Sequence, residues 1–190
     1  MNRRSAIKGI LAVAGLGYAS VIGVKYFIGQ SNKDRRKLKA QAALIAELTN
    51  VIIPPTTTPG AKEALVHEFI ISYMEDCSSM KEYNNFTNGL TELQENCVSN
   101  YNKYFENCTA VQKNEIVKDL DSDSGSTGII SKISNKLQGR SFYDILKSLT
   151  IEGYCTSEMG ATQHLVYQLI PGKYNAITQL SKNQKSWATK

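Results

Sequence analysis

The sequence predicts an all-α protein: a compact domain of about five to six helices with long loops, behind an N-terminal signal or anchor helix. Two observations favour this class. Apolar residues recur every three or four positions in several stretches between residues 33 and 149, which is the period of an amphipathic helix. No run alternates between apolar and polar residues strongly enough to indicate a strand.

A first helix is expected over residues 33–52. Pro54 and Pro55 follow it and end it, because a proline nitrogen cannot donate the helical hydrogen bond. The side chains expected to face the core follow the helical period. They are Leu38, Ala42, Ile45, Leu48 and Ile52.

A second helix is expected to begin at Thr58 and Pro59, with the threonine as N-cap and the proline in the first turn. Its predicted apolar face is Leu65, Phe69, Tyr73 and Cys77, flanked by Val66, Ile70 and Met74. A third helix is expected over about residues 83–105. Its apolar positions are Phe86, Leu90, Leu93, Cys97, Tyr101 and Phe105.

Two further helices are predicted from their starts. Thr109 and Gln112 have the spacing of a capping box, which opens a fourth helix through about Leu120. The segment 121–128 is rich in Asp, Ser and Gly and is expected to be a flexible loop. It lacks the glycine and glutamate positions of a calcium loop. Residues 141–144 then begin another helix, whose core residues are Phe142, Ile145, Leu146 and Leu149.

The N-terminus carries the marks of an export signal. Arg3 and Arg4 precede an uncharged, glycine-rich stretch, residues 9–24, a pattern typical of a twin-arginine signal. A membrane anchor is the alternative, although sixteen uncharged residues fall just short of the roughly 17–25 that span a bilayer. Both interpretations place the body outside the cytoplasm. They divide the chain into a signal or anchor, residues 1–30, and a helical domain, residues 31–190.

The positive charge of the chain is confined to its N-terminal part. The formal net charge is +5, from 22 Lys and Arg against 17 Asp and Glu. Residues 1–39 hold nine basic residues and one acidic residue, so they carry +8 and the remaining body carries −3. The body therefore lacks the basic cluster of a nucleic-acid-binding protein. The basic flank suits an anionic membrane surface.

The four cysteines, Cys77, Cys97, Cys108 and Cys155, lie in the body, where export would permit disulfides. In a hairpin of the second and third helices, Cys77 and Cys97 would lie roughly 20 Å apart, too far for a disulfide. Cys77 would be farther still from Cys108, and an intact third helix also separates Cys97 from Cys108. We therefore expect at most one bridge, involving Cys155, and favour buried thiols. No Cys-x-x-Cys-His motif or zinc-type spacing occurs.

The sequence offers little for catalysis. His67 is expected at a helix surface or half-buried, and His164 follows Ser157 and Glu158 in a polar segment. These last three could suggest acid–base or nucleophilic chemistry, but a Gly-x-Ser-x-Gly elbow and a glycine-rich phosphate loop are missing. We predict no catalytic residue, metal site or cofactor on this chain. The segment 153–164 suits a docking loop better, because its glycines permit close approach and its hydroxyls can bond a partner's main chain.

Two blocks of the sequence resemble a known family. The first is Val-Ile-Ile-Pro-Pro-Thr-Thr-Thr-Pro-Gly-Ala-Lys-Glu-Ala at residues 51–64, followed by Glu-Phe-Ile at 68–70. The second runs from Phe142 to Tyr174 and contains Thr-Ser-Glu-Met-Gly-Ala-Thr-Gln at 156–163. Together with the twin-arginine start, the chain resembles the gluconate 2-dehydrogenase subunit 3 family over nearly its whole length. This is the small gamma subunit of membrane-bound sugar and sugar-acid dehydrogenases.

The chain departs from the family pattern at a few positions. Thr57 stands where the family commonly has Asp, and Leu65 where it often has Gly. His67 replaces a frequent Pro, and Cys155 replaces the usual aromatic residue. The differences at Thr57 and Leu65 bear only on how the first loop would engage its partner.

The resemblance implies a non-catalytic accessory subunit. In such complexes the large subunit carries FAD and oxidises the substrate, and a cytochrome c subunit carries haem and passes electrons to the quinone pool. The small subunit is implied to take the flavoprotein, which lacks its own signal, through the twin-arginine translocase to the periplasm. An uncleaved N-terminal helix would hold it at the inner membrane. Two alternatives stay open: a stand-alone periplasmic enzyme using Glu158, His164 and Ser157, and a membrane-anchored helical binding module.

The predicted contact regions are the loop 54–61 and the segment 153–163, with the end of the second block. Arg3 and Arg4 are the predicted export signal. The predicted contact residues are Pro54, Pro55, Thr57, Pro59, Gly60, Ala61, Gly153, Tyr154, Thr156, Ser157, Glu158, Gly160, Thr162, Gln163, Pro171, Gly172 and Tyr174.

Overall fold

The computed structural model describes residues 33, 35–124, 139–170, 172, 177 and 179–188. The chain divides into two compact units, Met1–Lys33 and Asp34–Lys190, and the described residues after Lys33 belong to the second. The predicted export signal, with Arg3 and Arg4, lies outside the described residues, as do Pro171 and Tyr174.

The described residues of the second unit form helices, which confirms the predicted all-α class for this part of the chain. The elements are α2 (Arg35–Ala40), α3 (Ala42–Ile52), α4 (Val66–Asp76), α5 (Met80–Tyr101), the 3-10 helix η1 (Phe105–Asn107), α6 (Ala110–Ser124), α8 (Phe142–Thr156) and the π-helix η2 (Gly160–His164). Between described residues, the one β pairing is an isolated parallel bridge from Val166 to Trp187.

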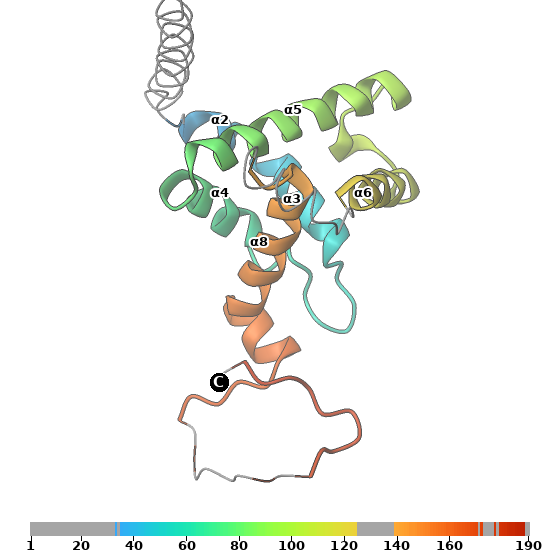
Figure 1. Ribbon diagram of the computed structural model, residues 1–190. Helices are drawn as coiled ribbons and strands as arrows, with labels where there is room; N and C mark the ends of the chain where they lie inside the picture. The colour runs from blue at the N-terminus through green and yellow to red at the C-terminus, as the bar shows by residue number, and fades with distance from the viewer. Residues whose placement is uncertain are drawn as a thin grey trace, which may run out of the picture. The chain divides into compact units, whose positions relative to one another are not determined.

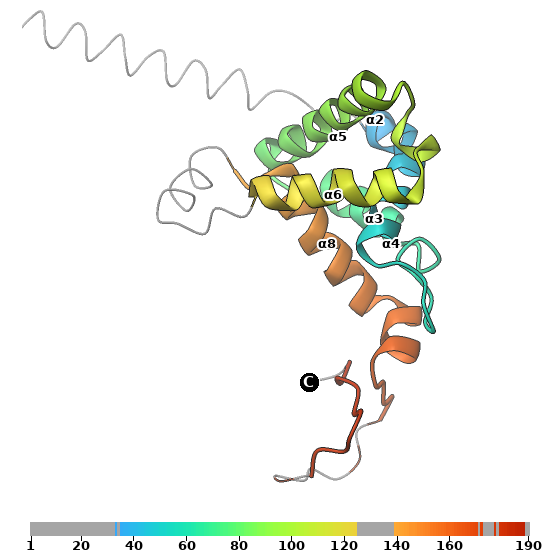
Figure 2. The same cartoon turned by 90° about the vertical axis from the view of Figure 1, so that its right-hand side faces the viewer.

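Helix α8 is the element on which most of the others pack. It contacts α3, α4, α5 and α6. In Figure 1, α3 and α8 lie between α4 on one side and α6 on the other, with α5 crossing above them. The turned view in Figure 2 shows α8 running from the level of α6 toward η2 at its far end. The first turns of α8 are therefore held in the core, whereas its last turn reaches the edge of the helical body.

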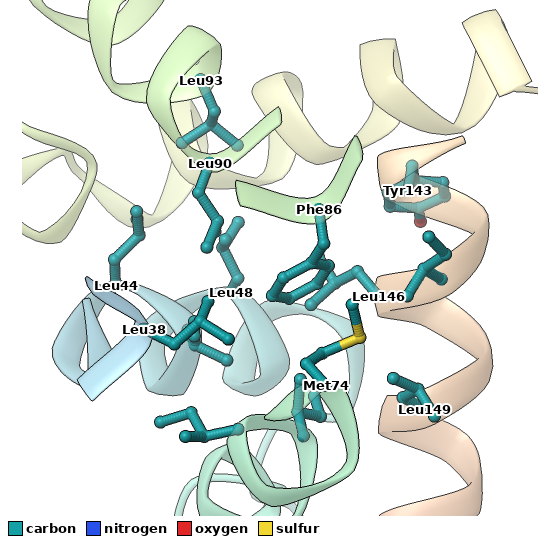
Figure 3. Packing of buried hydrophobic residues seen from close by; sticks show 14 of the residues in the cluster. Leu38, Leu44, Leu48, Met74, Phe86, Leu90, Leu93, Tyr143, Leu146 and Leu149 are labelled. Atoms are coloured by element: carbon teal, nitrogen blue, oxygen red, sulfur yellow. The ribbon is translucent and has the colours of Figure 1, made fainter. Parts of the chain in front are cut away.

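The core is filled by aliphatic and aromatic side chains from every α-helix of the described part (Figure 3). Phe86 of α5 is fully buried and stacks on Phe142 of α8 with ring centroids 5.4 Å apart. Met74 of α4 and Leu146 of α8 are also fully buried and reach the same centre. Apolar burial on this scale is the main source of folding free energy in a small domain.

The first predicted helix has the expected extent but is interrupted. A turn at Gln41 separates α2 from α3, and α3 ends at Ile52, just before the two prolines, as predicted. Leu38, Ile45 and Leu48 are fully buried, which confirms the predicted core face.

The predicted start of the second helix is wrong. Thr58 and Pro59 lie in a loop, and α4 begins only at Val66. The loop folds back on the end of α3, because Ala61 N donates a hydrogen bond to Ile53 O at 2.9 Å. That tertiary contact outweighs the local preference of a Thr-Pro pair for a helix start.

The core face of α4 also differs from the prediction. Val66, Ile70 and Met74, expected beside the main face, are the residues that the core buries. Leu65 is exposed, and Cys77 is exposed as well. The two faces differ by about one residue in register, which corresponds to roughly 100° of rotation about a helix axis.

Helix α5 begins and ends earlier than the predicted range of 83–105. Ser79 and Glu82 form a capping box: Glu82 N donates to Ser79 Oγ at 3.2 Å, and Ser79 N donates to the Glu82 carboxylate at 3.4 Å. Asn102, in the left-handed region with φ 53°, ends the helix at Tyr101. Phe105 is buried as expected but belongs to η1.

The early end of α5 corrects the expected separation of two cysteines. Because η1 turns the chain back, the Cys108 thiol lies beside the Cys97 thiol, and both are buried. Burial, with the Cys108 thiol as the next cause, raises the pKa of Cys97 to about 11. The expectation that these two lie far apart is therefore wrong. All four cysteines are free thiols, so Cys155 forms no bridge, and only Cys97 and Cys108 are fully buried.

The starts of α6 and α8 are confirmed. Thr109 N donates to Gln112 Oε1 at 2.9 Å and Gln112 N donates to Thr109 Oγ1 at 3.3 Å, as in the predicted capping box. At α8, Asp144 N donates to Ser141 Oγ at 3.2 Å. Helix α6 continues to Ser124, so the first four residues of the predicted loop 121–128 are helical. Residues 125–128 lie outside the described part.

Candidate partner-binding surface

Two segments that are far apart in the sequence meet at the end of α8. Tyr154 Oη donates a hydrogen bond to Pro59 O at 2.6 Å, and the Tyr154 side chain is buried. This bond joins the predicted contact loop 54–61 to the predicted contact segment 153–163. Residues 54–65 and 153–164 therefore form one surface, which we call the docking surface.

The first half of the docking surface has an exposed outer edge and a buried base. Pro54, Pro55 and Thr57 are exposed, whereas Gly60 and Ala61 are buried. A Cβ on Gly60 would lie 2.8 Å from Pro55 N, so the loop closes tightly only with glycine there. The buried residues thus shape the loop, and the exposed ones are available to a partner.

The second half is built by the last turn of α8 and by η2. Ser157 Oγ donates to Tyr154 O at 2.7 Å and accepts from Gly160 N at 3.0 Å. A Cβ on Gly160 would lie 1.8 Å from Tyr154 O, a distance that no side chain tolerates. Glycine at this position is therefore what allows η2 to follow α8 so closely.

The side chains of this half divide in the same way. Gly153 is buried against α4, where an added Cβ would lie 2.6 Å from Phe69 Cδ1. The exposed polar residues of this half can meet a partner, and Met159 is exposed beside them. These polar residues are Thr156, Glu158, Thr162 and Gln163. Gly172 is exposed too, beyond η2.

Leu65 has a backbone conformation that glycine would adopt more easily than leucine. Its φ is 54°, in the left-handed region that favours glycine, and its side chain is 53% exposed. Leucine at this point places an apolar side chain on the docking surface. Sequence periodicity assigned Leu65 to the core, so the structure adds an exposed apolar residue to the candidate site.

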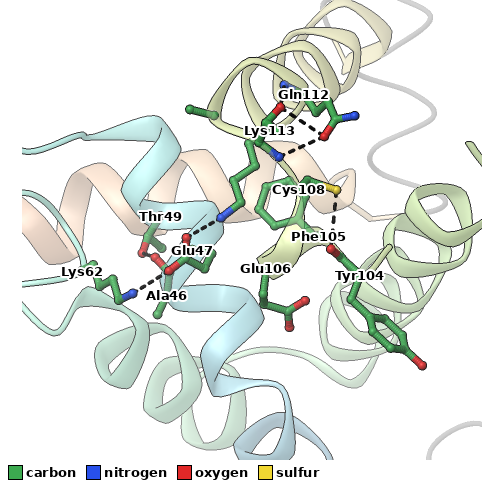
Figure 4. A network of polar contacts seen from close by, with 12 residues as sticks. Ala46, Glu47, Thr49, Lys62, Tyr104, Phe105, Glu106, Cys108, Gln112 and Lys113 are labelled. Carbon is green, nitrogen blue, oxygen red and sulfur yellow. Dashed lines mark hydrogen bonds and ion pairs between the residues drawn. The ribbon is translucent and has the colours of Figure 1, made fainter. Parts of the chain in front are cut away.

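An ion-pair network supports the loop from beneath (Figure 4). Glu47 of α3 accepts from Lys62 Nζ at 2.5 Å and from Lys113 Nζ of α6 at 2.7 Å. Partial burial would raise the pKa of Glu47, but the hydrogen bonds from Lys113 and Lys62 outweigh it and hold that pKa below its ordinary value. One carboxylate therefore ties α3, α6 and the base of the docking surface together.

Replacing Glu47 with Gln is expected to lower the free energy of unfolding at neutral pH by about 1–2 kcal/mol, because two charge-assisted hydrogen bonds are lost. The Glu47 pKa is lowered in the folded state, so its contribution is complete above the ordinary value of 4.5 and disappears as pH falls through the lowered pKa. Urea denaturation of both proteins from pH 7 to pH 2 measures the difference.

The exposed pair of Lys147 and Asp121, 2.7 Å apart, supplies a matched control. Asp121→Asn should cost less than about 0.5 kcal/mol, because solvent screens an exposed ion pair. A loss at Glu47→Gln that did not shrink in acid would contradict the assignment of its effect to the ionised carboxylate.

The three residues considered for catalysis are placed near one another but not as a catalytic set. The Ser157 hydroxyl is engaged by the backbone at Tyr154 and Gly160. The His164 ring stands against the Tyr154 ring, with centroids 5.6 Å apart, and Glu158 is exposed. The observed contacts of Ser157 and His164 hold η2 against the end of α8.

Other features of the described residues lie elsewhere. A groove of about 450 Å³ lies between Gln41 and the C-terminal half of α5 and is lined mainly by apolar atoms. Within the described ranges, no group of three or more His, Cys, Asp or Glu side chains is arranged to hold a metal ion. No helix of that part is long and apolar enough to cross a membrane.

Comparison with known proteins identifies the family. The sequence profile described as gluconate 2-dehydrogenase subunit 3 matches residues 39–172, which is more than half of the chain and contains the whole docking surface. The chain belongs to the gluconate 2-dehydrogenase subunit 3 family. Searches of curated proteins and of solved structures found no match.

Membership in the gluconate 2-dehydrogenase subunit 3 family bears on the interpretation of the docking surface, because both of its segments lie within the matched region. The family is that of an accessory subunit in a multi-subunit dehydrogenase. The match begins at Lys39 and ends at Gly172, so it includes α3 to η2 but not the residues after 172. Both segments that meet through Tyr154 and Pro59 therefore lie within the region that defines the family.

Proposed function

We propose that this chain is the non-catalytic small subunit of a periplasmic, membrane-associated dehydrogenase of the gluconate 2-dehydrogenase type. It binds and stabilises the FAD-containing large subunit, takes it through the twin-arginine translocase and helps to assemble it with a cytochrome c subunit. The N-terminal segment, with Arg3 and Arg4, would be the export signal, and it would hold the complex at the inner membrane if it stays uncleaved.

The observation that carries this proposal is that two segments within the family match meet in one surface through the Tyr154–Pro59 hydrogen bond. Exposed polar residues on that surface surround tightly packed glycines. Rigid loops with exposed polar side chains suit recognition of another protein's backbone. An accessory subunit needs such a surface more than it needs a reactive centre.

The cofactors in this proposal belong to the partners. The described residues include no phosphate-binding glycine loop, and the residues lining the groove beside the C-terminal half of α5 offer no Lys or Arg for the pyrophosphate of FAD. We therefore assign the flavin to the large subunit and the haem to the cytochrome c subunit. The rival function, a stand-alone enzyme using Ser157, Glu158 and His164, is less favoured because the Ser157 hydroxyl is occupied by the backbone.

The export role is tested by replacing Arg3 and Arg4 with Lys, which keeps the charge but removes the twin-arginine signal. Immunoblots of cell fractions should then find this chain and its flavoprotein in the cytoplasm, with periplasmic dehydrogenase activity lost. Lys25→Arg, a charge-conserving change outside the pair, is the control and should leave export intact. If the flavoprotein still reaches the periplasm in the Arg3→Lys/Arg4→Lys strain, this chain is not its escort.

A further inference from the structure

Beyond η2 the chain forms a loop that is closed at its base. Its described residues, which we call the C-terminal loop, are 165–170, 172, 177 and 179–188. Val166 and Trp187 form a parallel bridge, and Ala188 N donates to Val166 O at 2.9 Å. Lys185 Nζ donates to Gln163 O at 2.6 Å. These bonds fasten both ends of the loop to the docking surface.

The C-terminal loop exposes large apolar side chains instead of packing them. Figures 1 and 2 show it extending beyond η2, away from the helices of the same unit. Leu165 and Val166 at its base are half-buried, whereas its four other large aliphatic residues are 77–93% exposed and its two large aromatic residues are about half exposed. These exposed residues are Leu169, Ile170, Ile177, Leu180, Tyr167 and Trp187. Apolar side chains gathered in one exposed segment mark an interaction site.

The charge of this end of the chain is one-sided. After Glu158 the sequence contains four lysines and neither Asp nor Glu. A segment with this charge complements an acidic surface, and such complementarity favours binding and correct orientation. The partner is therefore expected to surround an apolar groove with carboxylates.

The backbone of the loop distinguishes a protein partner from a lipid bilayer. Between Tyr167 and Leu180, none of the described residues makes a backbone hydrogen bond to another described residue. The hydrocarbon layer of a membrane offers no hydrogen-bond partner to backbone N–H and C=O groups. A protein can pair them with its own backbone, as in strand addition to a sheet edge.

We propose that the C-terminal loop is an arm that grips the FAD-containing large subunit, with its apolar side chains in an apolar groove whose rim is acidic. This inference rests on the proposed function, which supplies the partner chain. The docking surface and the arm act as one continuous interface, because the base of the arm is bonded to η2 at Gln163. Residues 177–188 lie beyond the family match.

The arm is tested with the full-length protein in detergent and the flavoprotein that co-purifies with it. The double variant Leu169→Ser/Ile170→Ser should raise the dissociation constant for that flavoprotein at least tenfold, because two apolar side chains lose their burial in the complex. Val111→Ser on α6, at a position 76% exposed and outside the loop, is the matched control and should bind like the wild type. Both variants should unfold at the wild-type temperature, since the replaced side chains are exposed.

The single tryptophan of the chain, Trp187, gives a direct readout from the arm. Protein grown with 5-fluorotryptophan should show one fluorine resonance, which should shift or broaden on addition of unlabelled flavoprotein. Vesicles of phosphatidylcholine with one third phosphatidylglycerol should leave it unchanged. A response to these vesicles and not to the flavoprotein would overturn the inference in favour of a membrane contact.

A result that rules out the arm can be distinguished from one that rules out the proposed function. If the flavoprotein binds the loop variant as tightly as the wild type, the arm is wrong and the escort role stands. If no flavoprotein co-purifies with the wild-type chain, both are wrong.

Discussion

Phe86→Ala is expected to lower the free energy of unfolding by about 3–5 kcal/mol, a large part of the stability of a small domain. Phe86 is fully buried, and its ring packs on Phe142 across the contact of α5 with α8. Removing the ring leaves a cavity that the surrounding helices, packed from several directions, cannot close. Urea denaturation followed by circular dichroism measures the loss.

Val111→Ala is the control for this prediction. Val111 lies on α6 and is 76% exposed, so shortening it should change stability by no more than about 0.5 kcal/mol. A loss of less than about 1 kcal/mol at Phe86→Ala would mean that α5 and α8 are not held together as the structure shows.

Gly160→Ala is expected to weaken binding of the flavoprotein large subunit at least tenfold, given the proposed docking role. The new Cβ would lie 1.8 Å from Tyr154 O, so η2 must leave its position and the docking surface loses its second half. The clash is confined to the last turn of α8, and the buried residues of its earlier turns, Tyr143 to Thr150, should keep their packing. The free energy of unfolding should therefore fall by less than about 1 kcal/mol. Titration of the flavoprotein measures binding, and urea denaturation measures stability.

Asn88→Ala, at an exposed position on α5, should leave both quantities at their wild-type values. If Gly160→Ala bound the flavoprotein normally, η2 would not belong to the interface. If it unfolded the protein instead, η2 would be part of the cooperative core, and the division between core and docking surface would be wrong.

The elements predicted correctly are those whose signals act within one or two turns. The capping box of Thr109 with Gln112, the cap of Ser141 on Asp144 N, and the stop before Pro54 each depend on hydrogen bonds between neighbours in the chain. The signal that could have placed the start of α5, Ser79 followed by Glu82, is also local, and it was visible in the sequence but not used.

The start of α4 was mispredicted because a distant contact outweighs a local one. Thr58 and Pro59 have the composition of a helix start, but the loop that contains them is held by Ala61 N on Ile53 O and by Tyr154 Oη on Pro59 O. The second of these partners is 95 residues away along the chain. Periodicity in a single segment carries no information about such a bond.

The prediction that Cys97 and Cys108 lie far apart was wrong for a related reason. The expected separation assumed a helix continuing to about residue 105, whereas Asn102 ends it at Tyr101 with a left-handed backbone. A single residue at φ 53° reverses the chain through η1 and brings the two thiols together. The exact residue at which a helix ends can therefore determine whether two residues that follow it in the fold are far apart or in contact.

The all-α class, the end of α3, the starts of α6 and α8 and the family of accessory subunits could be predicted from the sequence. Helical periodicity, capping residues and family motifs are patterns of residues that lie close together in the chain. The folded structure was needed to show that the loop 54–65 and the segment 153–164 form one surface, and that Leu65 and the C-terminal loop expose apolar side chains. The physical reason is that burial depends on what a side chain meets after folding. Of two equally hydrophobic residues that both fit the helical period, one can therefore be buried in the core while the other is exposed on the surface.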